Sequence, residues 1–263
     1  MPGIIISIIN NKGGTGKTAT ACNLAHALSR MNQKVLVVDM DPQTNASNIL
    51  LGKSKTILGL YNLLDPDNKI DVASCITGTP YQDLYILPNI AETAALEPKL
   101  IRRAPGTLTI LREKLRDYAL NNFDFTIIDN PPNLGTFVIC SLYCSDFAIV
   151  PNEAGSKHSM EGLIKAVSFI NDIRKDGNVD LRFLKLLITK VDKRMSACKA
   201  IIAQIKKFFP SDKVFETIIP SNSDFQKAEL SSKPVYALRT NAPGSIAYTN
   251  LAKEILELLS KDI

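Results

Sequence analysis

The chain has 263 residues, of which 45% are hydrophobic and 22% charged, and its formal net charge at pH 7 is +5. This length suits one α/β domain with a well-buried core, so we expect a single domain over residues 1–263. No stretch approaches the roughly 20 consecutive apolar residues of a membrane span. The apolar N-terminal run has neither the basic region nor the cleavage site of a signal peptide, so the sequence predicts a cytoplasmic protein.

The five cysteines, an odd number spread along the chain, do not suggest a disulfide framework. Cys140 and Cys144 are four residues apart and could begin a metal site if their segment is helical. However, the chain has only two histidines, His26 and His158, and no second cysteine pair. We therefore expect buried apolar thiols and a His26 that is packed or solvated.

Short β-branched runs alternate with segments that have apolar residues at helical spacing, which is typical of strand–helix–strand units. The sequence predicts strands at residues 4–10, 34–39, 84–88, 124–129, 146–151, 184–189 and 216–220. It predicts helices at residues 17–31, 106–120, 158–175, 196–209 and 242–259. The least periodic region, about 52–103, is expected to be an excursion packed on the main sheet. The predicted fold class is α/β, a mostly parallel twisted sheet with helices on both faces and its chemistry at the carboxyl ends of the strands.

Residues 10–20, NNKGGTGKTAT, lie between the first strand and the first helix and contain most of a phosphate-binding loop. Its three glycines let backbone N–H groups converge on an anion, and the N-terminus of the next helix adds its positive dipole end. We expect Lys17 to reach the β- and γ-phosphates and the Thr18 hydroxyl to ligate Mg²⁺. The loop departs from the usual G-x-x-x-x-G-K-[ST] pattern, because Asn11 replaces the first glycine and a second lysine, Lys12, precedes the glycine pair.

Two predicted strands end in carboxylates. The second strand leads into VVDMDPQTN, where Asp39 and Asp41 are two residues apart and point the same way if the strand persists. One of them can hold Lys17 or a magnesium-bound water, and the other can orient the attacking water. The strand at 124–129 ends in Asp129, which fits a Walker B carboxylate that binds Mg²⁺ through water.

Together these motifs resemble those of the ParA/Soj family of partition ATPases, a branch of the deviant Walker A class of P-loop NTPases that includes MinD. The family loop K-G-G-x-G-K-[ST] is matched by Lys12, Gly13, Gly14, Thr15, Gly16, Lys17 and Thr18. The D-x-D-P-Q motif is matched by Asp39, Asp41, Pro42 and Gln43, and the D-x-P-P motif by Asp129, Pro131 and Pro132. The resemblance extends over nearly the whole chain. Two positions differ from many relatives, since Asn130 replaces a small residue and Ala19 a threonine.

The resemblance implies ATP and Mg²⁺ as cofactors and a homodimer that sandwiches two ATP molecules. In such a dimer the signature lysine, here Lys12, crosses to the phosphates of the partner's nucleotide, so that ATP holds the subunits together. The implied catalytic residues are Lys12, Lys17 and Asp41, with Thr18 and Asp129 as magnesium ligands and Asp39 behind them. The backbone N–H of Ala19 is expected to bind a phosphate, and Pro220 to neighbour the base.

The base itself stays open between adenine and guanine. Residues 189–192, Thr-Lys-Val-Asp, are similar to the T-K-x-D element with which some GTPases read guanine through the aspartate. ParA relatives also have a strand end here and generally use ATP. The signature-lysine loop favours ATP, and GTP is the competing nucleotide.

A basic segment from Arg182 to Lys213 contains nine basic and two acidic residues, more positive charge than the whole chain carries net. Such a segment fits nonspecific DNA binding, in which lysine and arginine displace phosphate counterions without reading bases. The predicted DNA contacts are Lys193, Arg194, Lys199, Lys206 and Lys207. The C-terminal segment LAKEILELLSKDI resembles a packed helix rather than a basic amphipathic membrane anchor, so no membrane partner is expected.

The sequence therefore predicts a Mg²⁺-dependent ATPase, weak by itself, that dimerises on ATP and associates with the nucleoid. A ParB-like centromere-binding protein would trigger hydrolysis and so segregate a plasmid or chromosome. Two other functions stay open. One is a ParA-like ATPase that positions another cargo, such as a protein complex or a membrane-surface scaffold. The other is a metabolic P-loop enzyme similar to dethiobiotin synthetase.

Overall fold

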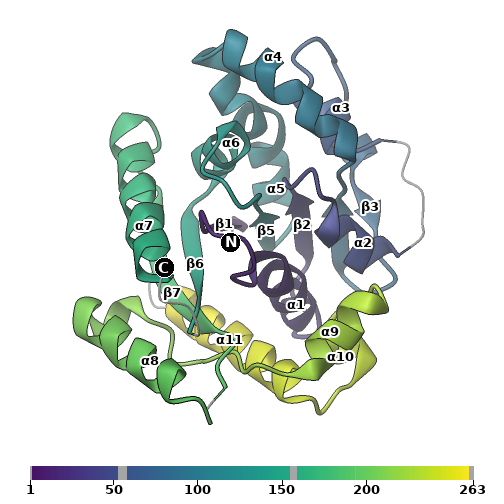
Figure 1. Ribbon diagram of the computed structural model, residues 1–263. Helices are drawn as coiled ribbons and strands as arrows, with labels where there is room; N and C mark the ends of the chain where they lie inside the picture. Colours follow the sequence, from purple (N-terminus) through teal and green to yellow (C-terminus); the bar gives the residue numbers. More distant parts are fainter. Residues whose placement is uncertain (1, 53–57, 155–158, 193, 261–263) are drawn as a thin grey trace.

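The computed structural model describes residues 2–52, 58–154, 159–192 and 194–260, which build a seven-stranded sheet with helices on both faces (Figure 1). The strands are β1 (Ile4–Ile8), β2 (Val35–Asp39), β3 (Thr77–Gly78), β4 (Leu84–Leu87), β5 (Phe125–Asp129), β6 (Phe147–Glu153) and β7 (Arg182–Thr189). Their order is β3-β4-β2-β5-β1-β6-β7, and every neighbouring pair is parallel except β3 and β4. This topology confirms the predicted fold class.

The helices form two layers, because alternate side chains of the strands feed separate cores. One face is covered by α1 (Lys17–Ser29), α2 (Asn45–Leu51), α9 (Ser223–Leu230), α10 (Val235–Leu238) and α11 (Pro243–Ser260). The other face is covered by α3 (Leu60–Leu64), α4 (Glu97–Arg102), α5 (Asp117–Asn122), α6 (Thr136–Cys144), α7 (Ser159–Asp176) and α8 (Ser196–Phe208). None of the described helices is long and apolar enough to cross a membrane.

The central strands explain why the site forms where it does. All residues of β2 and β5 are buried, as expected for parallel strands covered on both faces. Their last residues, Asp39 and Asp129, are partners in the parallel register, and Ile8 of β1 is the partner of Asp129 on the other side. Two carboxylates therefore end side by side at the point where the chain leaves β1 for the glycine-rich loop.

Two predicted elements are wrong in detail. The helix expected at 106–120 is broken into a 3-10 turn (Gly106–Thr109), a π-helical turn (Arg112–Arg116) and α5. The expected strand at 216–220 makes one isolated bridge, between Pro220 and Val191. The N–H groups of Glu216 and Thr217 instead donate to the carboxylate of Glu254 in α11, at 2.9 and 3.0 Å. The Glu254 side chain thus accepts the hydrogen bonds that a neighbouring strand would otherwise accept from these two residues. The prediction also omitted α6, which carries both neighbouring cysteines.

The predicted burial of the cysteines and the packing of His26 are confirmed. All five cysteines are buried and free, and the described residues contain no group of three or more potential metal ligands from His, Cys, Asp and Glu. His26 packs against Tyr81, with ring centroids 4.6 Å apart, and burial lowers the pKa of His26 to about 4. His158 lies outside the described residues. The excursion at 52–103 contributes β3 and β4 to the main sheet, and α11 packs along α1.

Replacing Glu254 by alanine should destabilise the fold by about 1–2 kcal/mol, because two backbone N–H groups lose a charged acceptor. Lys185, whose Nζ lies 3.6 Å from Glu254, would also lose its ion pair. Urea unfolding followed by circular dichroism measures the change. Glu257→Ala, on the exposed side of the same helix, is the control and should stay within about 0.5 kcal/mol of the parent. Equal stability of the two variants would show that Glu254 does not hold this segment.

Candidate nucleotide-binding site

The glycine-rich loop between β1 and α1 has the backbone conformation that an anion site needs. Gly14 and Gly16 lie in the left-handed region, with φ of 76° and 91°. Gly16 immediately precedes Lys17, the first residue of α1. Because a β-carbon disfavours this conformation, glycine at these two positions lets the loop curl. Its N–H groups can then converge on an anion bound at the N-terminus of α1.

Neighbouring strands fix the loop in place. The Asn10 side chain donates from Nδ2 to the carbonyl of Pro151 in β6 at 2.8 Å, and its Oδ1 accepts the N–H of Lys12 at 3.0 Å. The hydroxyl of Thr189, the last residue of β7, donates to the carbonyl of Thr15 at 2.8 Å. The sequence analysis missed both supports, because it treated Asn10 only as part of the loop and Thr189 only as part of the T-K-x-D element.

Lys17 lies inside the loop. Only 7% of Lys17 is exposed, and its ammonium donates to the carbonyl of Lys12 at 3.1 Å. Burial lowers the pKa of Lys17, and the carboxylates of Asp129 and Asp41 act in the opposite direction. The ammonium is therefore held between the loop and the acidic strand ends, where a phosphate bound by the loop N–H groups would meet it.

Asp129 fits a magnesium site. Its carboxylate is fully buried, and neither oxygen has a hydrogen-bond partner among the described residues. Burial and the nearby Asp39 raise the pKa of Asp129 well above its usual range, while the Thr18 hydroxyl and the Lys17 ammonium act to lower it. Unsatisfied carboxylate oxygens beside a hydroxyl are the hard donors that Mg²⁺ prefers, directly or through water. Thr18 and Asp129 are therefore the residues that would hold the ion.

Asp39 and Asp41 have different environments. Asp39 is fully buried, and its Oδ2 accepts both the N–H and the hydroxyl of Ser47, at 2.8 and 2.7 Å. Burial raises the pKa of Asp39 to about 6. The Ser47 hydroxyl also accepts the N–H of Asn89, so Asp39 fastens α2 to β2 and the segment after β4. Asp41 instead lines the cavity and uses Oδ1 to accept the N–H of Gln43 at 2.9 Å.

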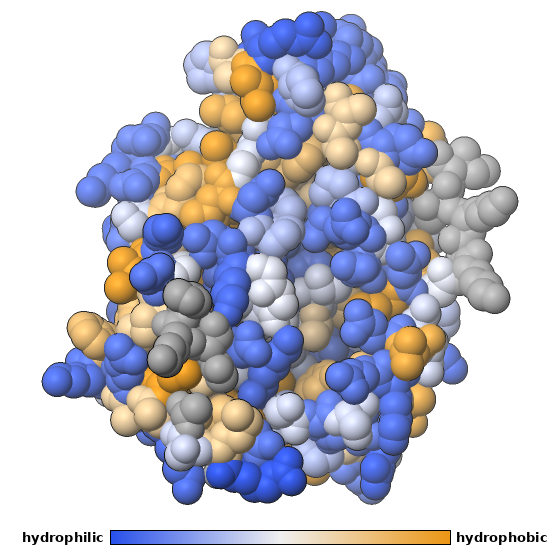
Figure 2. Space-filling model, in the orientation of Figure 1, coloured by the Kyte–Doolittle hydropathy of each residue, from blue (hydrophilic) through white to orange (hydrophobic). Residues whose placement is uncertain are grey.

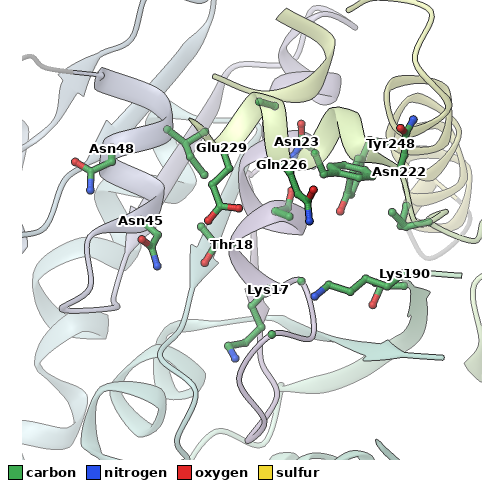
Figure 3. Close-up of a pocket in the computed structure, with 18 of the residues that line it drawn as sticks. Lys17, Thr18, Asn23, Asn45, Asn48, Lys190, Asn222, Gln226, Glu229 and Tyr248 are labelled. Carbon is green, nitrogen blue, oxygen red and sulfur yellow. Dashed lines mark hydrogen bonds between the residues drawn. The ribbon is translucent and has the colours of Figure 1, made fainter. Parts of the chain in front are cut away.

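A cavity of about 960 Å³ opens over the loop, within the size range of small-molecule and cofactor sites (Figure 3). The predicted nucleotide-binding residues that line it are Gly13, Gly14, Gly16, Lys17, Thr18, Ala19 and Pro220. Thr15 is 1% exposed and faces the protein interior. Residues of α9 that the sequence analysis did not single out, Gln226 and Glu229, point into the cavity from the side opposite Lys17 (Figure 3).

Near Pro220, which was predicted to neighbour the base, only part of the T-K-x-D segment lines the cavity. Thr189 and Lys190 line the cavity together with Pro220. The Asp192 carboxylate is held by Arg194, which donates from its backbone N–H at 3.0 Å, from Nε at 2.9 Å and from Nη2 at 2.7 Å. These hydrogen bonds lower the pKa of Asp192 to about 2. In this structure the Asp192 carboxylate is therefore hydrogen-bonded to Arg194, two residues further along the chain.

The signature lysine and the basic segment lie at the surface. The Lys12 ammonium is 3.9 Å from the Glu153 carboxylate at the end of β6, and 32% of the Lys12 side chain is exposed. On α8, Lys199, Lys206 and Lys207 are exposed, opposite the buried Cys198 and Ile205. Arg194 is 90% exposed and paired with Asp192. Lys193 lies outside the described residues. On the face shown in Figure 2, hydrophobic side chains lie in small groups among hydrophilic ones.

The sheet order and the loop with its acidic strand ends define a P-loop nucleotide-binding protein. Residues 3–183 match the AAA domain family. The chain is 34% identical to the sporulation initiation inhibitor protein Soj of Bacillus subtilis, over 96% of this chain and 98% of Soj. It is 32% identical to the chromosome-partitioning ATPase Soj of Thermus thermophilus, over 95% of this chain and 94% of that protein.

A structural relative is the cobyrinic acid a,c-diamide synthase of Mycobacterium smegmatis, solved with bound ADP and magnesium. Its TM-score is 0.84 at 25% sequence identity, covering 99% of this chain and 97% of that chain. With the two Soj proteins, these findings confirm the resemblance on which the motif analysis rests. The chain belongs to the ParA/Soj family of P-loop ATPases.

Replacing Thr18 by alanine should abolish most of the gain in ADP affinity that Mg²⁺ provides, a loss of about tenfold or more, because the ion loses a hydroxyl ligand. Calorimetric titration with ADP, in Mg²⁺ and in a chelator, measures this gain directly. Thr18→Ser keeps the hydroxyl and should keep the gain. If Thr18→Ala responds to Mg²⁺ like the parent protein, Thr18 is not a ligand.

Proposed function

We propose that this protein is the ATPase of a DNA-partition system. It hydrolyses ATP slowly with Mg²⁺, forms an ATP-bound dimer, binds nucleoid DNA without reading bases, and is stimulated by a ParB-like centromere-binding protein. The observation that carries the proposal is the exposed Lys12 at the rim of the phosphate loop, beside an interior site for phosphates and magnesium. The names of the two Soj relatives, a chromosome-partitioning ATPase among them, support the biological role.

The hydrolytic step follows from the positions of three side chains. Lys17 and the loop N–H groups stabilise charge on the β- and γ-phosphates, and a Mg²⁺ held by Thr18 and Asp129 would supply further charge neutralisation. Asp41 reaches the cavity and is the carboxylate available to orient the attacking water. Asp39 cannot do this, because it is fully buried and its two oxygens accept hydrogen bonds from Ser47 and from the N–H of Asp41.

Dimer formation depends on an exchange of partners by Lys12. Its contact with Glu153 is long and partly exposed, and such ion pairs contribute little. A charge-assisted hydrogen bond from Lys12 to a phosphate of the partner's ATP is stronger. The nucleotide therefore favours the dimer only while the triphosphate is intact, and hydrolysis removes this difference in affinity.

DNA binding would use the exposed lysines of α8. Lys199, Lys206 and Lys207 can each neutralise a backbone phosphate and release counterions. A single copy of this surface has few charges and binds weakly. Two copies joined in one dimer gain affinity through their high effective concentration, so DNA retention follows the nucleotide state.

A metabolic function is the second candidate, because the similar cobyrinic acid a,c-diamide synthase structure is named as an enzyme of small-molecule synthesis. The cavity of about 960 Å³ also extends past the loop to α2 and α9. ATP turnover that requires a small acceptor, rather than DNA and a protein partner, would support this candidate.

Lys12→Gln should give a protein that still binds ATP but stays monomeric, because the cross-subunit phosphate contact is lost. Asp41→Ala should show the opposite behaviour, with ATP-dependent dimers and at least a hundredfold slower hydrolysis. Light scattering after size exclusion and phosphate release measure the two properties.

Asp117→Ala, an exposed site on α5, should behave like the parent in both measurements. Dimers of Lys12→Gln at saturating ATP, or undiminished hydrolysis by Asp41→Ala, would contradict the assigned roles.

The combined variant Lys199→Ala, Lys206→Ala, Lys207→Ala should lose most DNA retention in ATP. The salt dependence of its binding should fall, since each lost phosphate contact lowers the log–log slope by about 0.9. Fluorescence anisotropy with random duplexes over a salt series, in ATP and in ADP, provides the slopes. Lys253→Ala, an exposed lysine of α11, is the control. If DNA binding depends neither on the bound nucleotide nor on the α8 lysines, the alternative function, a ParA-like ATPase that positions another cargo, is favoured.

A further inference from the structure

The carboxyl end of β7 is attached to the phosphate loop. Thr189 is 2% exposed, and its hydroxyl donates to the carbonyl of Thr15. The next residue, Lys190, therefore leaves the sheet directly beside the loop. Its backbone has a φ of 54°, in the left-handed region that a lysine seldom adopts.

Hydrogen bonds around Val191 hold this unusual turn. The N–H of Val191 donates to the carbonyl of Ile219 at 3.1 Å, and its carbonyl accepts the N–H of Ser221 at 2.9 Å. The Lys190 side chain is thereby aimed at the loop. Its ammonium lies 3.9 Å from the point that a β-carbon on Gly14 would occupy. Figure 3 shows this side chain reaching from the end of β7 toward the loop, on the side away from α2.

The position of this ammonium determines which part of a nucleotide it can meet. Lys17 occupies the interior of the loop near Asp129, where the terminal phosphate and the metal belong. Lys190 approaches Gly14 from the side of Pro220, where the nucleoside belongs. The loop N–H groups between them cradle the α- and β-phosphates. Among the described residues, no hydrogen-bond or ion-pair partner of the Lys190 ammonium is found, so it can accept an anionic ligand.

We propose that Lys190 is a third cation of the nucleotide site and binds an oxygen of the α- or β-phosphate. This inference rests on the proposed function, because it requires a nucleotide in this cavity. Lys190 belongs to the T-K-x-D segment but acts independently of guanine recognition, since Asp192 is held by Arg194. A cation on the diphosphate stabilises bound ADP and ATP equally, and so it sets affinity rather than the rate of hydrolysis.

The test measures ADP and ATP affinity by calorimetry in Mg²⁺ for a set of Lys190 variants. Lys190→Met and Lys190→Gly should each weaken both nucleotides by about tenfold, with equal factors for ADP and ATP. Lys190→Arg should stay within about threefold of the parent, because it keeps the charge. Lys190→Gly accepts a φ of 54° without strain, so it separates loss of the ammonium from damage to the turn. Lys253→Met removes one positive charge from an exposed position on α11 and should bind like the parent.

Several results would overturn the inference. Parent-like affinity in Lys190→Met and Lys190→Gly would show that the ammonium does not bind phosphate. Weak binding by Lys190→Met with parent-like binding by Lys190→Gly would show a backbone role instead. A loss confined to ATP would move the contact to the γ-phosphate. If the parent protein binds neither nucleotide, the proposed function fails as well, and this outcome is distinct from the others.

Discussion

The site depends on a charge imbalance at the ends of β2 and β5. Asp39 and Asp129 end adjacent strands without exposure to solvent, and Lys17 is the cation whose charge is favoured by Asp129 and by Asp41. One ammonium does not balance this group of carboxylates, and the Asp129 oxygens have no other partner in the described part of the chain. Burial raises the pKa of both carboxyl groups, and a divalent cation bound beside Asp129 would stabilise the ionised form. The loop N–H groups and Lys17 suit the negative phosphates of a nucleotide. The acidic ends of β2 and β5 suit the metal ion that accompanies those phosphates.

Rigid attachments between distant segments hold these opposite charges at short range. Asp39 fixes α2 through Ser47, Asn10 fixes the loop to β6, and Thr189 fixes it to β7. Each is a buried side-chain hydrogen bond, and those of Asn10 and Thr189 join elements more than 100 residues apart in sequence. Asp41 and Lys190 line the cavity, and Lys12 lies at the surface beside Glu153.

The sequence predicted the fold class and the motif residues, because glycine spacing and strand-terminal acids are local signals. It could not separate the roles of Asp39 and Asp41 from spacing alone. Their difference depends on Ser47, eight residues beyond Asp39, and on Asn89, which is adjacent only in the folded chain. The strand expected at 216–220 was wrong for a similar reason, since Glu254 in the last helix takes the N–H groups of that segment. Tertiary partners override local propensity at such positions.

The lysines of the molecule differ in burial, and this difference determines how strongly each one can act on a phosphate. Lys17 is buried among carboxylates, so its charge acts on a phosphate at short range and is weakly screened by salt. Lys12 and the lysines of α8 are exposed, so each alone contributes little and is sensitive to ionic strength. Under the proposed function, the buried Lys17 binds the nucleotide strongly within one subunit, whereas the surface lysines make weak contacts to other molecules. Assembly would therefore depend on the bound nucleotide. In the proposed function, a dimer would bring two copies together and add these weak contacts to a useful affinity, and loss of the γ-phosphate would remove them.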